Sequence, residues 1–168
     1  GNLSGIKATE YSKNIGSIPK VDDNDIRKII QGATSILLRE NGNNPYLIHE
    51  ELQKNMQYNV GIIRTKNEIE NGIKEIDVLK SKFKDVKAPG SSQFNPGWHE
   101  ALALRNLLIS AESVAKSALI REESRGAHTR EDFPSEREEW IKYNIINKKG
   151  KDGKMETAKI LRTNPDKE

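Results

Sequence analysis

Cysteine is absent from all 168 residues, so disulfides, thiolate catalysis, iron–sulfur ligation and cysteine zinc sites are excluded from this chain. Aromatic residues make up only 5% of it, which disfavours a β-sandwich and favours helices built on isoleucine, leucine and alanine. No apolar run approaches the roughly 18 residues of a membrane span, so we expect no direct membrane insertion. With no secretory signal in view, the sequence predicts a cytoplasmic protein.

The chain also carries little excess charge, because 28 basic residues face 25 acidic ones for a net charge of +3. That balance does not by itself predict nucleic-acid binding. The basic residues of the C-terminal part are Lys142, Lys148, Lys149, Lys151, Lys154, Lys159 and Arg162. Asp152, Glu156 and Asp166 interrupt this stretch, and only Trp140 and Tyr143 could stack on bases. We therefore expect a solvated hairpin there and no nucleic-acid partner.

Two helices are predicted in the N-terminal part of the chain. Ser4 is placed to cap a short helix that runs to about Asn14, and residues 16–20 form a linker. The acidic residues within 21–25 suit the positive end of a second helix, whose apolar positions recur until Glu40.

Longer helices are predicted in the middle of the chain. Pro45 stands where a helix can begin, and Thr65 and Glu68 have the spacing of a capping box. The apolar seam that follows consists of Ile69, Ile73, Ile76, Leu79, Phe83 and Val86. Prolines and glycines at 87–97 break the pattern, and a last helix is predicted from Trp98 to Glu123. The face that we expect this helix to bury consists of Leu104, Leu107, Leu108, Ala111, Val114, Ala115, Ala118 and Leu119.

Beyond Pro134 the pattern changes to the alternation of a strand. Residues 140–146 alternate, the glycines of KKGKDGK (148–154) suit a turn, and residues 155–162 again mix β-branched and polar side chains. We predict a β-hairpin that covers one end of the bundle, with frayed residues at 164–168.

These patterns together predict the fold class. It is mainly α: a helical bundle of about three to four main helices over 21–134, with a small C-terminal β-hairpin and tail over 135–168.

Neither His49 nor His99 belongs to a metal-binding motif. No second histidine follows His49-Glu50 at the spacing of a zinc-binding HExxH helix. We expect His49 on a helix surface and His99 in a packing or hydrogen-bonding role, and we predict no metal site.

The segment ESRGAHTREDFP (123–134) is the most charged stretch that follows a helix. His128 stands here among Arg125, Arg130 and Asp132, as an acid/base site or as part of an ion-pair network. We favour the network, because such clusters are far more often structural, and we assign no catalytic residue.

Gly126 falls where the long helix must stop, and glycine tolerates the left-handed conformation of a C-terminal cap. Arg121 and Arg125 near that end favour the helix dipole. Forked guanidinium donors and carboxylates can hold several chain segments in one geometry. The segment therefore predicts a latch, either internal or to a neighbouring domain.

One long run, QFNPGWHEALALRNLLISAESVAKSALIREESRGAHTREDFP, resembles the C-terminal helical domain of succinate dehydrogenase and fumarate reductase flavoproteins. LQKNMQYNVGIIRTKNEIENGI upstream and EEWIKYNI downstream are similar to the same domain, so the resemblance covers most of residues 45–162. GNLSGIKATEYSKN looks like the family's junction after its FAD-binding domain. Residues 1–20 would then be a junction helix and linker from a missing FAD-binding domain.

The resemblance implies an FAD-dependent oxidoreductase of the tricarboxylic acid cycle and electron transport. In that family hydride moves between flavin N5 and the C2–C3 bond of succinate or fumarate, and electrons pass through an iron–sulfur subunit to quinone. The catalytic side chains lie on the FAD-binding and capping domains. The resemblance therefore implies no catalytic residue and no cofactor held by this chain alone, with FAD in the full-length protein.

For this chain the resemblance implies structural and interfacial roles. Gly1, Ser4 and Gly5 would lie beside the flavin of the full-length protein. The partners would be the FAD-binding domain of the same flavoprotein and the iron–sulfur subunit, which would hold the chain at the cytoplasmic face of a membrane. The predicted latch to the rest of the flavoprotein consists of Arg121, Arg125, His128, Arg130 and Asp132.

Two other hypotheses stay open at this point. L-aspartate oxidase shares the architecture and works without an iron–sulfur partner, and FNPGWH and the Trp140 hairpin favour the dehydrogenase over it. A free-standing, non-catalytic helical adaptor is the alternative from another class.

Overall fold

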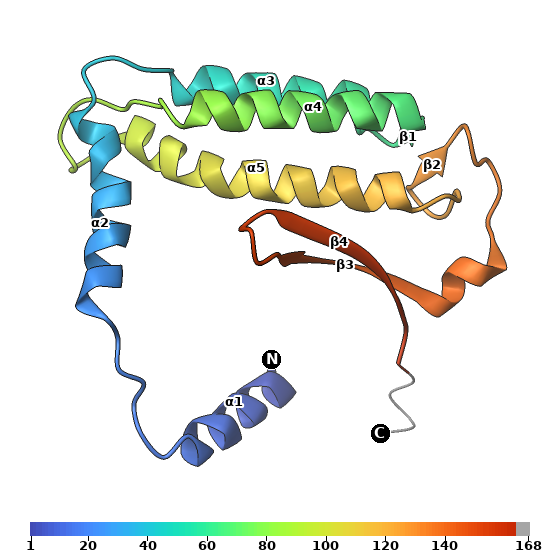
Figure 1. Cartoon of the computed structure of the whole chain (residues 1–168), viewed down its shortest axis with the longest axis horizontal. Helices are drawn as coiled ribbons and strands as arrows, with labels where there is room; N and C mark the ends of the chain where they lie inside the picture. The colour runs from blue at the N-terminus through green and yellow to red at the C-terminus, as the bar shows by residue number, and fades with distance from the viewer. Residues whose placement is uncertain (164–168) are drawn as a thin grey trace. The chain divides into compact units, whose positions relative to one another are not determined.

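Helices dominate the structure, which confirms the predicted fold class. The computed structural model describes residues 1–163, and the residues 164–168 that we expect to fray lie outside that range (Figure 1). The α-helices are α1 (Asn2–Asn14), α2 (Asp23–Leu38), α3 (Pro45–Asn59), α4 (Lys66–Phe83) and α5 (Pro96–Ile120). The strands are β1 (Ile63–Arg64), β2 (Thr129–Arg130), β3 (Tyr143–Lys149) and β4 (Met155–Leu161), with a 3-10 helix η1 (Glu138–Lys142) before β3. Along residues 1–163 no helix is both long and apolar enough to cross a bilayer.

Residues Gly1–Ser35 form a unit of their own, separate from the rest of the chain. Helix α1 buries none of its residues. Its N-cap is Gly1, and Gly5 N donates to Gly1 O at 3.0 Å, so the hydrogen-bond ladder begins before Ser4. The prediction that Ser4 caps this helix is therefore wrong. Acidic Asp23 and Asp25 lie in the first turn of α2, as the sequence predicts.

The second unit begins at Ile36, and its helices start where local signals predict. Asn44 caps α3 by accepting from Tyr46 N at 2.9 Å, with Pro45 in the first turn. Thr65 and Glu68 form the predicted capping box at the start of α4, with Thr65 N donating to Glu68 Oε2 at 2.6 Å. These contacts satisfy backbone N–H groups that a helix leaves unpaired at its first turn.

Helix α5 is displaced from its predicted bounds. It begins at Pro96, where Asn95 Oδ1 accepts from Trp98 N at 2.9 Å, and it ends at Ile120. Gly126 does adopt a left-handed φ of 59°, but it does not cap the helix. It lies in a tight turn in which Arg125 N donates to His128 O at 2.8 Å. The predicted glycine stop is wrong because side chains, described below, satisfy the last helical carbonyls instead.

Helices α3, α4 and α5 pack around one apolar core. Its fully buried members are Ile69, Ile76, Val86, Ala101, Leu104 and Ala115, all 0% exposed. His49, predicted on a helix surface, is half-buried and joins α3 to α5 through Nδ1, which lies 2.5 Å from Glu100 Oε1. Leu107 and Val114 were expected in the buried face, but they are 38% and 50% exposed. The buried face of α5 is therefore narrower than its sequence predicts.

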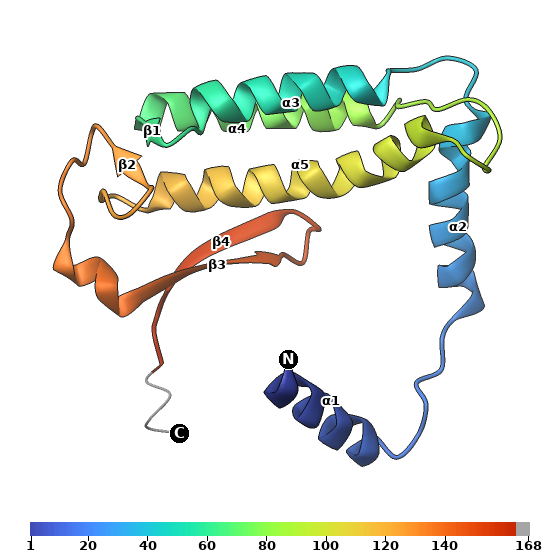
Figure 2. The same cartoon turned by 180° about the vertical axis from the view of Figure 1, so that it is seen from behind.

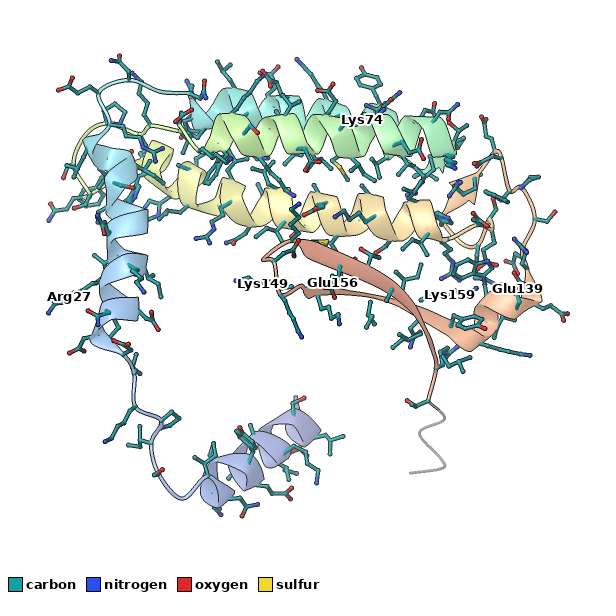
Figure 3. The ribbon with its side chains drawn as sticks, viewed as in Figure 1. Arg27, Lys74, Glu139, Lys149, Glu156 and Lys159 are labelled. Carbon is teal, nitrogen blue, oxygen red and sulfur yellow. The ribbon has the colours of Figure 1, made fainter. Side chains whose placement is uncertain are left out.

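The C-terminal hairpin is present, with antiparallel β3 and β4 in the register Asn147↔Thr157. Trp140 precedes it in η1 and is buried. Lys159 covers this indole, with Nζ 3.8 Å from the ring centroid (Figure 3). The hairpin lies along the C-terminal half of α5 rather than across the ends of the helices (Figures 1 and 2).

A small polar network holds the hairpin on the helix. Asn147 Nδ2 donates to the hydroxyls of Ser113 and Ser117 on α5, at 2.8 Å in each case. Thr157 Oγ1 of β4 donates to Asn147 Oδ1 at 2.6 Å. One amide therefore connects both strands of the hairpin to α5.

We predict that Asn147→Ala loosens the hairpin and lowers the free energy of unfolding by about 1–3 kcal/mol, because partly buried hydroxyls lose their partner. Amide hydrogen exchange across β3 and β4 measures the loosening. Asn144→Ala is the matched control, since Asn144 lies on the same strand but is exposed. Equal exchange in both variants would show that the network does not hold the hairpin.

Candidate functional site

The segment after α5, residues 121–137, is called the arginine loop below. It is joined to the start of α4 by a short parallel pair, in which β1 pairs with β2 in the register Arg64↔Arg130. Thr129 N donates to Ile62 O and Glu131 N donates to Arg64 O, both at 3.1 Å. The loop is therefore fixed to a segment far away in the sequence.

Arg130 lies at the centre of the loop and is only 1% exposed. Its Nη1 donates to the carbonyl oxygens of Ala118, Leu119 and Arg121, at 3.0, 3.1 and 3.3 Å. These are carbonyls of the last turn of α5 and its C-cap, which the helix itself leaves unpaired. A guanidinium therefore ends the helix and places positive charge at the negative end of its dipole.

Asp132 neutralises the same guanidinium. Its two carboxylate oxygens accept from Arg130 Nε at 2.7 Å and from Nη2 at 2.6 Å, in the parallel geometry of a bidentate pair. Asp132 Oδ2 also accepts from Lys66 N in the first turn of α4, at 3.1 Å. The Arg130 contact, with a smaller effect from Lys66 N, lowers the pKa of Asp132 to about 2. Asp132 is therefore ionised at neutral pH and joins the end of α5 to the start of α4.

Glu123 is the second anchor of the loop, and its side chain is 0% exposed. It accepts from Arg121 Nη2 at 2.5 Å, from Arg125 Nε and Nη2 at 3.1 Å each, and from Arg137 N at 3.0 Å. Burial raises the pKa of this carboxyl, but the hydrogen bonds outweigh burial and lower the pKa to about 2. A buried carboxylate with several donors thus draws both ends of the loop together.

The outer side of the loop carries further ion pairs. Arg125 Nη1 lies 3.0 Å from Glu136 Oε2, and Arg137 Nη2 lies 2.7 Å from Glu139 Oε1, which Figure 3 labels. These residues are more exposed than Glu123, so their pairs contribute little to stability.

His128 is directed at the main chain. Its Nε2 lies 3.0 Å from Arg121 O, and a carbonyl only accepts, so Nε2 carries the proton and donates it. Burial lowers the pKa of His128, and the charges of Arg64 and Arg130 lower it further, which outweighs the Arg121 contact. The imidazole is therefore neutral at pH 7 and serves the end of α5. This geometry supports the ion-pair network over the acid/base interpretation.

Two members of the loop's environment carry no signal in the sequence. Arg64 is 9% exposed and donates to Ala127 O at 3.5 Å, although the two residues are far apart in the sequence. Ser124 Oγ accepts from Arg130 N at 2.8 Å and donates to Phe133 O at 2.9 Å. Hydrophobic periodicity does not predict either set of contacts, because the Arg64 contact depends on how β1 meets β2 and the Ser124 contacts depend on how the loop folds on itself.

The N-terminal residues expected near a flavin are open. An added Cβ at Gly1 or Gly5 would meet no atom within 4 Å, and Ser4 lies on the same exposed helix. Gly1 caps α1 without a side-chain hydrogen bond. The space around both glycines leaves room for a bound group, but these three exposed residues do not enclose one by themselves. Within residues 1–163 no group of three or more His, Asp or Glu side chains could hold a metal ion.

The family model of the fumarate reductase flavoprotein C-terminal region matches residues 49–165. The chain belongs to this family. The matched range contains α4, α5, the arginine loop and the hairpin, which are the elements of the site described above.

Individual relatives agree with this membership. A protein of Methanothermobacter marburgensis, one of the subunits of its fumarate reductase (CoM/CoB), is 42% identical over 113 residues, 67% of this chain and 21% of that protein. The succinate dehydrogenase flavoprotein of Rickettsia conorii is 34% identical over 158 residues, 90% of this chain and 26% of that protein. The solved structure of Mycobacterium smegmatis Sdh1 in complex with UQ1 matches 94% of this chain and 26% of its own, with 34% identity and a TM-score of 0.86.

This C-terminal flavoprotein domain spans about a quarter of the length of those relatives. The sequence singles out the arginine loop as the candidate site, and that assignment stays a prediction. It did not predict that Glu123 would be the most buried carboxylate of the loop, nor that Arg130 would face inward.

We predict that Glu123→Gln lowers the free energy of unfolding of this family member at pH 7 by about 2–3 kcal/mol, because charged hydrogen bonds are weakened. The pKa of Glu123 is lower in the folded protein than in the unfolded chain, so the ionised side chain stabilises the fold. This stabilisation is fully present at pH values above the unfolded-state pKa. It is lost as the pH falls toward about 2. The stability difference between wild type and variant should therefore shrink between about pH 5 and pH 2, as measured by urea unfolding. The neighbouring exposed Glu122, changed to Gln, is the control and should show no such difference.

Proposed function

We propose that this chain is the C-terminal brace of a flavoprotein that interconverts succinate and fumarate and passes electrons through an iron–sulfur subunit to quinone. The observation that carries the proposal is the family match over residues 49–165. The named relatives are fumarate reductase and succinate dehydrogenase subunits, which favours this activity over L-aspartate oxidation.

The arginine loop supports a bracing role. Arg130 and Glu123 turn their charges onto the chain's own carbonyls, N–H groups and opposite charges. A substrate-binding guanidinium would instead need donors left free for a dicarboxylate. The loop therefore fixes the end of α5 to the start of α4. The reacting groups belong to other parts of the full-length protein.

The loop also offers an outward side for contact with the FAD-binding domain. Arg121, Arg125 and Asp132 keep 25%, 30% and 30% of their side chains exposed. Arg130, at 1%, contacts Arg121 O and Asp132 from within, and His128 contacts Arg121 and Arg125. We assign these residues to the latch between this domain and the rest of the flavoprotein. We propose that the flavoprotein lies in the cytoplasm, at the membrane face that its partner subunits occupy.

FAD is proposed for the full-length protein, where it supplies hydride transfer to or from the dicarboxylate. Gly1, Ser4 and Gly5 would lie against it, since the two glycines leave open space and the start of α1 has no side-chain cap. A helix N-terminus with free N–H groups favours a polar or anionic neighbour. These residues contact the cofactor but do not hold it alone.

The proposal predicts that the purified 168-residue chain is colourless and does not oxidise succinate. The full-length flavoprotein should carry FAD, seen by its visible absorbance, and should reduce a dye with succinate. Stoichiometric FAD bound to the 168-residue chain would contradict the proposal that other parts of the full-length protein hold the cofactor. Absence of flavin from the full-length protein would contradict the proposed activity.

Arg125→Ala in the full-length flavoprotein is expected to weaken domain packing or binding of the iron–sulfur partner more than hydride chemistry. Within residues 1–163, the polar contacts of Arg125 are with other residues of the arginine loop. FAD content, co-purification of the partner and turnover per bound flavin are the measurements. Loss of turnover alone, with flavin and partner retained, would give Arg125 a direct part in the reaction.

A further inference from the structure

Helix α5 has a flank on each side, between the side that packs on the core and the side that packs on the hairpin. It lies between the α3–α4 pair and the hairpin, and it is uncovered in the opposite views of Figures 1 and 2. Its core side carries Leu104 and Leu108, and its hairpin side carries Ser113 and Ser117. At about 3.6 residues per turn, the remaining positions divide into a flank on each side.

The two flanks differ in chemistry. One carries Arg105 and Ile109 and continues to Glu112 and Lys116, where Glu112 pairs with Lys80 of α4 at 2.6 Å and with Lys116 at 2.8 Å. This flank is charged, and Glu112, which is only 8% exposed, links it to α4.

The other flank has no charge. Ala103, Leu107, Ser110 and Val114 follow one another at spacings of four, three and four, which place them in one line along the helix. All four are exposed, with Leu107 at 38% and Val114 at 50%. We call these residues the uncharged flank. In a chain in which 32% of residues are charged, such a line matches the charge-depleted core of an interface.

We propose that the uncharged flank of α5 is a docking face for the remainder of the flavoprotein polypeptide, which packs against Leu107 and Val114. The inference rests on the proposed function. It commits to this occupant because the same fold, at a TM-score of 0.86, occurs in a chain of which it makes up only 26%. Most of such a polypeptide lies outside this domain and can cover a face that the domain itself leaves open.

The docking face also accounts for the error in the predicted buried face. Leu107 and Val114 have the residue types and the spacing of core positions, but the domain's own core lies on another side of α5. Core-type residues that stay exposed on one domain are expected where a second domain packs against them.

The test compares Val114→Lys with Ile109→Lys in the full-length flavoprotein. The two residues are 50% and 49% exposed on the same helix, and both changes replace a β-branched residue by lysine, so helix propensity changes alike. Limited proteolysis at the boundary of this domain is the measurement. We expect Val114→Lys to speed cleavage at least about tenfold, as the loss of one buried interface anchor would. Ile109→Lys should stay within about twofold of wild type, because Ile109 is an exposed residue on the charged flank.

Equal protease resistance of wild type and both variants would overturn the proposal, because the flank would then face solvent. Sedimentation of the 168-residue chain tests the rival occupant. A dimer that Val114→Lys abolishes, with full-length protein unaffected, would assign the face to a second copy and overturn our choice. Flavin content of the wild-type full-length protein is read separately. Missing flavin would refute the proposed activity, whereas faster cleavage of Val114→Lys would still support the docking face.

Discussion

The buried guanidinium of Arg130 is the contact on which the rest of the domain depends. A charge that is 1% exposed is tolerated only where opposite charge and hydrogen-bond acceptors surround it. Asp132 supplies the charge, and the end of α5 supplies three carbonyl acceptors. Asp132 also accepts from Lys66 N, so the Arg130–Asp132 pair connects the end of α5 to the start of α4.

The remaining features divide into a rigid interior and open outer surfaces. The arginine loop and the Asn147 network fix α4, α5 and the hairpin to one another. The uncharged flank of α5 is left without a partner in the same unit, and α1 buries none of its residues. A domain that buries Glu123 and Arg130 and leaves an uncharged flank exposed fits the proposed role of supporting a larger protein.

Local signals predicted the elements well. Pro45 with Asn44, and Thr65 with Glu68, mark helix starts because capping depends only on residues a few positions apart. The alternation after Pro134 predicted the hairpin for the same reason. Gly126 misled the prediction of the end of α5, because a left-handed glycine suits a tight turn as well as a helix cap. Arg130, which lies beyond that turn, satisfies the last carbonyls of α5 in place of a glycine cap.

The sequence by itself therefore determined the fold class, the hairpin and the family. Periodicity, caps and recognisable runs are all properties of neighbouring residues. Only the tertiary structure decided that Glu123 and Arg130 are buried, that Arg64 donates to Ala127 O, and that Leu107 and Val114 lie outside the core. Burial depends on which elements meet across the chain, and the parallel pairing of β1 with β2 brings together segments whose separation no local pattern encodes.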